Sequence, residues 1–371
     1  MAIKNENRRR IKVAVNGSGT IGRAMIVEII MTPSNCIDLV AVNDKMPIEE
    51  AVELLEHNFW SRCRERYAVG TSDNKKEILV ATPDGRNLRF LYFEYTGELP
   101  WSKVEAPIDI VIECSGVYST REQLQQHIDE GARSVLLSRR SKTAHDVDKT
   151  VVFGINHHDI QKDDKIISAA TCTTGASIFL IKMMDQLVNF EFCHTLSVHV
   201  PLNRKTNYDD GPGRSIGYTS HFGVKGNVIP TECSVELMVP RVLGGRFAGR
   251  ISSSMICVPT VGGSYMQMTF FAKNNKKNKL IDAEFLNKKL EEYIKTLPHD
   301  QIVSVSHRDM ASAVVDCKPY SCIVDASRTL VLKGKRNTKY TFEIWHDTAW
   351  GYASRLLDIA KVMMSQYLSD N

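Results

Sequence analysis

The sequence contains no run of apolar residues long enough to cross a bilayer, and its first residues are too polar for a signal peptide. It has nine cysteines, but no CxxC motif and no Cys/His spacing typical of a zinc site. An odd and irregularly spaced set of cysteines favours reduced thiols over a disulfide framework. We therefore expect a cytoplasmic protein that has no membrane partner and no bound metal.

A strong charge of one sign is also missing. The formal net charge is only +4 over 371 residues, which gives no reason to expect a nucleic-acid partner. Hydrophobic residues make up 43% of the chain and charged residues 24%, and these values are ordinary for a globular protein. The chain has no internal repeat, and its length is sufficient for two domains.

A glycine-rich motif stands between two regular elements near the N-terminus. We expect an apolar strand over 11–15 and a helix over 24–30, separated by Gly17, Gly19 and Gly22 in the pattern G-x-G-x-x-G. Such glycines allow a tight turn, the approach of a pyrophosphate and close packing of helix on strand. The next strand, over 37–43, ends at Asp44, where a carboxylate binds the ribose of NAD. The order of these elements predicts an NAD site, whereas the motif alone is also compatible with a packing turn.

Further apolar strands are expected over 108–113 and 134–138, with a helix between them. Strands that alternate with helices indicate a parallel, doubly wound sheet. Ligands bind beyond the carboxyl ends of such strands, so Ser115, Gly116 and Ser138 are candidate cofactor-binding residues. Each of the three is equally compatible with an ordinary turn.

Cys172 stands between an expected strand over 165–167 and an expected helix over 176–184. A thiol on the first turn of a helix is close to unpaired N–H groups and to the positive end of the macrodipole, which lower its pKa. The neighbouring threonines can cap the same turn. The stretch thus indicates either a nucleophilic cysteine or a buried structural one.

The second half of the chain has a different character. A strand over 195–200 alternates, with Ser197 and His199 on one face, and more strands are expected over 251–260, 265–271, 321–325, 329–332 and 341–345. We expect a mixed or antiparallel second domain. The segment over 205–227 is long and contains several glycines, which is typical of a functional loop. The final helix, over 353–367, is amphipathic and is expected to return to the first domain.

These pieces together resemble the phosphorylating glyceraldehyde-3-phosphate dehydrogenase family, to which the bacterial erythrose-4-phosphate dehydrogenases are closely related. The resemblance runs from about residue 11 to the C-terminus. The motifs that carry it include N-G-x-G-x-I-G-R (16–23), V-N-D (42–44), E-C-S-G-V-Y (113–118), V-V-F-G-I-N (151–156), T-C-T-T (171–174), S-V-H (197–199) and W-G-Y (350–352).

The resemblance implies an α/β fold with a Rossmann-type, doubly wound parallel sheet and an α+β catalytic domain with a mostly antiparallel sheet. The NAD-binding domain would span 1–171, completed by a C-terminal helix over 349–371, and the catalytic domain 172–348. In this family Cys172 would attack an aldehyde, and His199 would pair with the thiolate and handle the hydroxyl proton. The family also implies a homotetramer. Further residues implied at the site are Thr20, Ile21 and Thr348 for NAD, and Thr171 and Thr173 for the substrate.

The chain departs from the family where the family binds phosphate. The family's arginine before V-P-T is Cys257 here, and its two threonines after S-V-H fall on Leu202 and Arg204. The asparagine that holds the nicotinamide amide is Thr348, which offers one donor in place of two. Arg204 and Lys205 are new cations, either a replacement anion site or solvated loop charges.

Three functions follow as hypotheses. The leading one is NAD-dependent oxidation of a small polar aldehyde through a thiohemiacetal and a thioester on Cys172. The first alternative is oxidation of glyceraldehyde 3-phosphate or erythrose 4-phosphate with rebuilt phosphate contacts. The second is a non-catalytic paralogue that binds the dinucleotide. The sequence does not distinguish phosphate from water as acyl acceptor.

Overall fold

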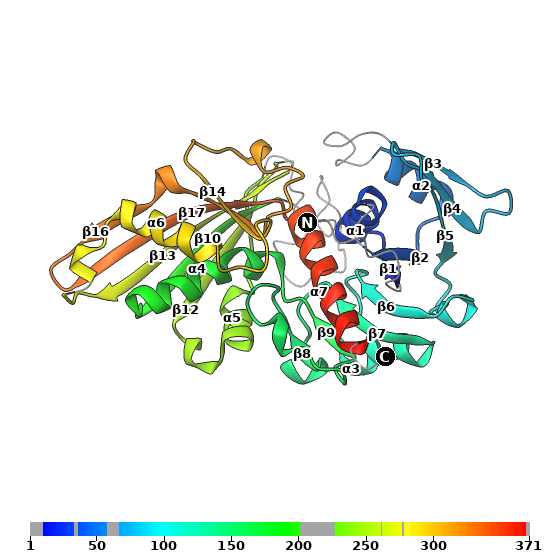
Figure 1. Cartoon of the computed structure of the whole chain (residues 1–371), viewed down its shortest axis with the longest axis horizontal. Helices are drawn as coiled ribbons and strands as arrows, with labels where there is room; N and C mark the ends of the chain where they lie inside the picture. Colours follow the sequence, from blue (N-terminus) through cyan, green and yellow to red (C-terminus); the bar gives the residue numbers. More distant parts are fainter. Residues whose placement is uncertain are drawn as a thin grey trace. The chain divides into compact units, whose positions relative to one another are not determined.

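The computed structural model describes residues 10–32, 36–57, 67–200, 227–260, 262–276 and 278–368. The chain divides into two compact units (Figure 1). Unit 1 comprises Met1–Val151, His157–Ala169 and Leu356–Asn371, and unit 2 comprises Val152–Asn156 and Ala170–Arg355. Each unit has a sheet of its own. Among the helices described, none combines the length and the apolar character that a bilayer-spanning helix needs.

Unit 1 is built on a nine-stranded sheet of order β3-β4-β5-β2-β1-β6-β7-β9-β8. The strands from β5 through β8 in this order pair in parallel, whereas β3, β4 and β5 pair antiparallel. The bounds are β1 (Ile11–Asn16), β2 (Ile37–Asp44), β3 (Ala68–Thr71), β4 (Glu77–Ala81), β5 (Asn87–Glu94), β6 (Ile108–Glu113), β7 (Ala132–Leu137), β8 (Lys149–Thr150) and β9 (Ile166–Ser168).

The strand order of unit 1 reverses at β1, which has β2 on one side and β6 on the other. Such a reversal opens a crevice beyond the carboxyl ends of the strands. Every residue of β6 is buried, which explains why its sequence is apolar except at Asp109 and Glu113. The helices of unit 1 are α1 (Thr20–Met31), α2 (Ile48–Glu56) and α3 (Arg121–Asp129), joined by α7 (Trp350–Leu368) from Leu356 onward. The expected doubly wound sheet is confirmed.

Unit 2 holds an eight-stranded sheet of order β11-β12-β10-β13-β17-β15-β14, with β16 paired to β17. Only the β10–β12 and β14–β15 pairs of this described sheet are parallel, so the expected mostly antiparallel sheet is confirmed. Its strands are β10 (Phe192–His199), β11 (Ile229–Thr231), β12 (Ile251–Cys257), β13 (Ser264–Lys273), β14 (Val303–Ser306), β15 (Cys322–Asp325), β16 (Leu330–Lys333) and β17 (Asn337–His346).

The helices that begin in unit 2 are α4 (Cys172–Val188), α5 (Val235–Leu243), α6 (Ala283–Ile294) and the first turns of α7. Helix α4 packs on β13, β15 and β17 and also contacts α5 and α6 (Figure 1). Its residues Ile178, Phe179, Leu180 and Ile181 are completely buried. Such burial stabilises the helix by about 1.5–3 kcal/mol for each large apolar side chain. A rigid helix therefore carries Cys172.

Candidate active site

The chain turns sharply just before Cys172. Ala170 has a φ of 56°, an uncommon conformation for a residue that is not glycine. Thr171 is then extended and is the N-cap of α4, and Cys172 is the first helical residue. The turn and the cap together fix the thiol at the helix N-terminus, as the sequence predicts.

The Thr171 hydroxyl is a centre of hydrogen bonding at this end of α4. It accepts from the backbone N–H of Thr174 at 3.3 Å, and it lies 2.8 Å from the Thr174 hydroxyl and 3.2 Å from that of Thr173. It also lies 3.1 Å from the hydroxyl of Ser234, the N-cap residue of α5. Thr171 therefore ties the starts of α4 and α5 together. Thr173 is buried beside it.

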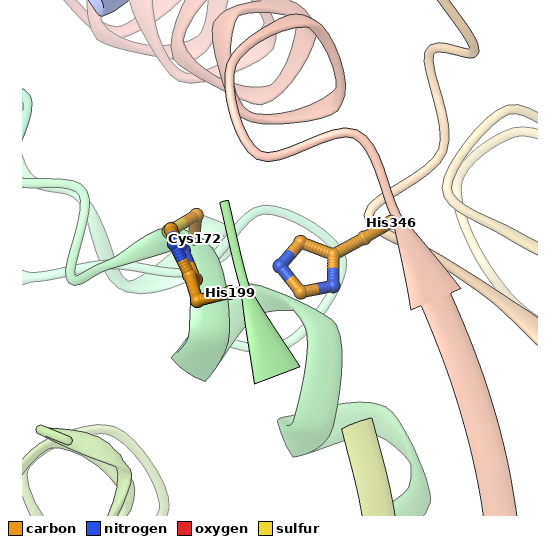
Figure 2. A group of neighbouring side chains, drawn as sticks. All are labelled: Cys172, His199 and His346. Atoms are coloured by element: carbon orange, nitrogen blue, oxygen red, sulfur yellow. The ribbon is translucent and has the colours of Figure 1, made fainter. Parts of the chain in front are cut away.

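His199 is the last residue of β10 and faces the thiol of Cys172 (Figure 2). The Sγ of Cys172 lies 3.7 Å from Nε2 of His199. The other ring nitrogen, Nδ1, donates a hydrogen bond of 2.7 Å to the carbonyl of Val200. Because Nδ1 then carries the proton of the neutral ring, Nε2 presents its lone pair to the thiol. The structure thus places the two predicted catalytic residues together.

Burial keeps this pair neutral in the free chain. It raises the pKa of the Cys172 thiol to about 12, although the side chain is only partly covered. It also lowers the pKa of His199, while the bond to Val200 acts in the opposite direction. The position at a helix N-terminus predicts a lowered pKa for this thiol. That prediction is wrong, because desolvation of the thiolate outweighs the nearby backbone N–H groups.

A second imidazole stands next to the pair. His346 ends β17, and its ring is turned toward Cys172 and His199 (Figure 2). The ring centroids of His199 and His346 are 6.2 Å apart. His346 is only 2% exposed, and neither of its ring nitrogens has a hydrogen-bond partner among the described residues. Burial, together with the neighbouring His199, lowers the pKa of His346 to about 3. This residue was not predicted from the sequence, although a histidine at the end of a buried strand of this sheet is a usable signal.

The glycine motif of unit 1 has the contacts that a dinucleotide loop needs. A Cβ atom on Gly17, whose φ is 90°, would lie 2.5 Å from the Cα of Ser115. A Cβ on Gly22 would lie 1.9 Å from the carbonyl oxygen of Gly17, so α1 is pressed against the turn. Gly19 is the N-cap of α1, and no side chain caps that end. Thr20 and Ile21 form the first turn, where backbone N–H groups bind phosphate in such folds. These residues fit NAD.

Asp44 closes β2 beside this loop. Its Oδ2 accepts hydrogen bonds from the backbone N–H of Ser18 and, at 2.9 Å, from the Ser18 hydroxyl. Its Oδ1 accepts from the N–H of Met46 at 3.0 Å. A carboxylate has about four acceptor sites, so further donors such as ribose hydroxyls can be accommodated. The position agrees with the ribose-binding role predicted for it.

The remaining cofactor candidates of unit 1 surround Glu113. This buried carboxylate accepts from the N–H and hydroxyl of Ser115, from Nδ2 of Asn16 and from Nε2 of His127. Ser138 donates its backbone N–H to the Glu113 carbonyl at 3.0 Å. Gly116 has a φ of 71°. The network fixes the turn after β6 against the glycine loop. It was not foreseen from the sequence.

Three further predictions concern unit 2. Thr348 is buried, and its hydroxyl is bonded to that of Ser264 at 2.7 Å. Arg204 and Lys205, the predicted anion-binding cations, lie outside the described residues, and so does nearly all of the 205–227 segment. Cys257 is buried and pairs with His199 in the register of β10 and β12. The position at which the resemblance implies the family's arginine therefore carries a thiol next to His199.

Most of the described cysteines are not in a disulfide. These are Cys36, Cys114, Cys172, Cys193, Cys233, Cys257 and Cys322. Cys317 is disulfide-bonded, so the expectation of reduced thiols throughout is wrong at that residue.

Comparison with known families agrees with both units. Residues 11–121 match the family model described as glyceraldehyde 3-phosphate dehydrogenase, NAD binding domain. Residues 171–348 match the one described as glyceraldehyde 3-phosphate dehydrogenase, C-terminal domain. The two matches support NAD as cofactor and NAD-dependent dehydrogenase activity on a small molecule. The chain belongs to the glyceraldehyde-3-phosphate dehydrogenase family.

Proposed function

We propose that this protein oxidises a small polar aldehyde through Cys172 and His199, with NAD as cofactor. One observation carries the proposal: Cys172 Sγ lies 3.7 Å from His199 Nε2, and His199 Nδ1 donates to Val200. This is the arrangement of a nucleophile and its general base, with a third group orienting the base.

In the resting pair both groups are neutral, so the thiol proton has to move from Cys172 to His199 as the reaction begins. His199 Nε2 takes the thiol proton as Cys172 attacks the aldehyde carbon, which forms a thiohemiacetal. The backbone N–H of Cys172, at the start of α4, is positioned to bind the developing oxyanion. The protonated His199 then gives this proton to the oxyanion, which becomes the thiohemiacetal hydroxyl, and takes it back as the hydride leaves. NAD, when bound, supplies the hydride acceptor for this adduct. The resulting thioester on Cys172 is released by phosphate or water.

The substrate that we propose is an aldehyde other than glyceraldehyde 3-phosphate. Position 257, which neighbours His199 in the sheet, carries a thiol in place of the family's guanidinium. A guanidinium binds phosphate by two parallel, charge-assisted hydrogen bonds, whereas a thiol is a weak donor. A phosphorylated aldehyde thus loses a principal contact next to the reacting carbon.

Steady-state assays test the proposal. NADH formation is measured with a panel of unphosphorylated polar aldehydes, with glyceraldehyde 3-phosphate and with erythrose 4-phosphate, each with and without inorganic phosphate. We expect the highest kcat/KM for an unphosphorylated aldehyde and no activity for Cys172→Ala. Highest activity with either phosphorylated aldehyde would establish the first alternative function. Binding of NAD without oxidation of any aldehyde would establish the non-catalytic one.

We also propose that the protein works as a cytoplasmic homotetramer. Seven of the described cysteines are not in a disulfide, which supports a reducing compartment. Leu330 and Leu332 are 45% and 51% exposed on β16, an edge strand, which supports a contact with another subunit. Light scattering coupled to gel filtration is expected to give four times the chain mass of 41.8 kDa. A monomer mass would contradict the tetramer.

A further inference from the structure

Three potential metal ligands converge in unit 2. The Sγ of Cys172 and ring nitrogens of His199 and His346 all lie within 4.8 Å of one another. They come from the start of α4 and from the ends of β10 and β17, as Figure 2 shows. No metal-binding spacing exists in the sequence, because the three residues are far apart along the chain.

The proposed oxidation uses two of these residues and leaves His346 unexplained. A buried imidazole normally has a hydrogen-bond partner for at least one nitrogen, because burying an unpaired polar group costs about 1–3 kcal/mol. Among the described residues, His346 has none for either nitrogen. An imidazole without such a partner beside a thiol is available as a metal ligand.

We infer that Cys172, His199 and His346 form a binding site for one zinc ion, which blocks the nucleophile reversibly. Thiolate and imidazole are the ligands that Zn²⁺ prefers, at about 2.3 and 2.0 Å. Neighbouring ligand atoms of a tetrahedral zinc are then about 3.5 Å apart for a sulfur and a nitrogen and about 3.3 Å apart for two nitrogens. The Cys172–His199 separation of 3.7 Å is already close to the first value. The other separations need a closure of about 1.5 Å at most, since none exceeds 4.8 Å.

The hydrogen bond that orients the His199 ring also suits a bound metal. A histidine that binds zinc through one nitrogen usually donates its other N–H to a carbonyl or carboxylate, which fixes the ring. His199 already does this through Nδ1 and Val200. On binding, Cys172 loses its thiol proton to solvent and forms the S–Zn bond, while the imidazoles each donate a lone pair. Nothing is oxidised, and the fourth position is left for water.

Direct metal binding tests the site, without aldehyde or NAD, so the result is independent of the proposed function. Zinc affinity of the metal-free full chain is measured by competition with a chromogenic chelator. We expect one zinc ion per chain and at least tenfold weaker binding by His346→Gln. Two matched controls, His194→Gln on the exposed side of β10 and Cys233→Ser near Cys172, should stay within twofold of the wild type. Unchanged affinity in His346→Gln, or a larger loss in Cys233→Ser, would overturn the site.

X-ray absorption at the zinc edge needs no variant and covers the case in which His346→Gln fails to fold. The wild-type complex is expected to show one sulfur at about 2.3 Å and two imidazole nitrogens at about 2.0 Å. Replacement of zinc by cobalt should add the near-ultraviolet band of a cobalt thiolate, absent in Cys172→Ala. A zinc ion with only oxygen neighbours, or two sulfur neighbours, would contradict the assignment.

Discussion

The reactivity of Cys172 depends on where its proton resides before the substrate arrives. Burial raises the pKa of the thiol to about 12 and lowers that of His199, so thiol and imidazole are both neutral near pH 7. The thiolate is then formed only as the proton moves to Nε2 during attack. This differs from a preformed thiolate–imidazolium pair, in which Cys172 would react rapidly with any electrophile.

The pH dependence of alkylation distinguishes these two states. Below a pKa of about 12, the thiolate fraction rises about tenfold for each pH unit. We expect the rate of Cys172 labelling by iodoacetamide to follow this rise from pH 6 to pH 9 without a plateau, as measured by mass spectrometry of the Cys172 peptide. The solvent-exposed Cys36 is the internal reference. A plateau for Cys172 below pH 8 would show a preformed ion pair.

The role of Gly22 is steric. Its absent Cβ would lie 1.9 Å from the carbonyl oxygen of Gly17, a distance that forces α1 away from the turn. We expect Gly22→Ala to lower the free energy of unfolding of unit 1 by at least about 2 kcal/mol and to weaken NAD binding more than tenfold. Denaturant unfolding and a cofactor titration measure the two effects.

The matched control for Gly22 is Gly70→Ala, since in the described part of the chain no atom beyond its chain neighbours lies within 4 Å of a Cβ at Gly70. That variant should leave NAD affinity unchanged. Equal effects of the two substitutions would show that the Gly17–Gly22 contact does not shape the cofactor loop.

At the scale of the element, the start of α4 holds the nucleophile in place. The Thr171 hydroxyl accepts from the Thr174 N–H and contacts Ser234 of the neighbouring cap. We expect Thr171→Ala to lower the free energy of unfolding by about 1 kcal/mol, the usual value of an N-cap. The same variant should reduce kcat for aldehyde oxidation, because Cys172 follows the cap directly. Thr171→Ser keeps the hydroxyl and should retain both properties; equal losses in both variants would contradict the capping role.

The elements that the sequence predicts best are those buried on both faces. Strand β6 is mostly apolar because its whole length is covered, and β10 alternates because alternate residues are buried. The strands β3, β4 and β5 were missed, since they are short or half exposed and form antiparallel pairs at the sheet edge. Helix α5 was missed because Pro240 lies inside it, which argues against a helix.

Residues of the site were also predictable only where the local sequence marks them. Cys172 and His199 were predictable because a local motif surrounds each of them, and both motifs resemble one family. His346 and the Glu113 network were not, since each depends on side chains that only the folded chain brings together. The pKa direction of Cys172 also requires the fold, because the sequence reveals the helix N-terminus but not the burial that opposes it.

At the scale of the whole molecule, one unit holds the predicted cofactor loop and the other the reactive residues. Because the loop of Gly17–Gly22 and Asp44 lies in unit 1, bound NAD should stabilise that unit first. At a concentration one hundred times Kd, NAD adds about 2.7 kcal/mol to the free energy of unfolding of the bound state. We expect the melting temperature of unit 1, followed by calorimetry, to rise accordingly.

NADP is the control ligand for this shift. The Asp44 carboxylate repels its extra phosphate, so NADP should shift the melting temperature far less than NAD. Asp44→Asn keeps an oxygen acceptor for Ser18 and removes the charge. In this variant, the ratio of the Kd for NADP to the Kd for NAD should fall at least tenfold. A wild-type chain that binds both cofactors equally would contradict the role of Asp44.

The most direct test of the central claim is detection of an acyl group on Cys172. The protein is mixed with NAD and its best aldehyde substrate in the absence of phosphate and quenched in acid within the first turnover. Intact-mass and peptide analysis should find the mass of the aldehyde less two hydrogen atoms on Cys172, with NADH formed in equal amount. His199→Asn should reduce its rate of formation by at least a hundredfold. Rapid NADH formation with no adduct on Cys172, or an adduct on another residue, would contradict the mechanism.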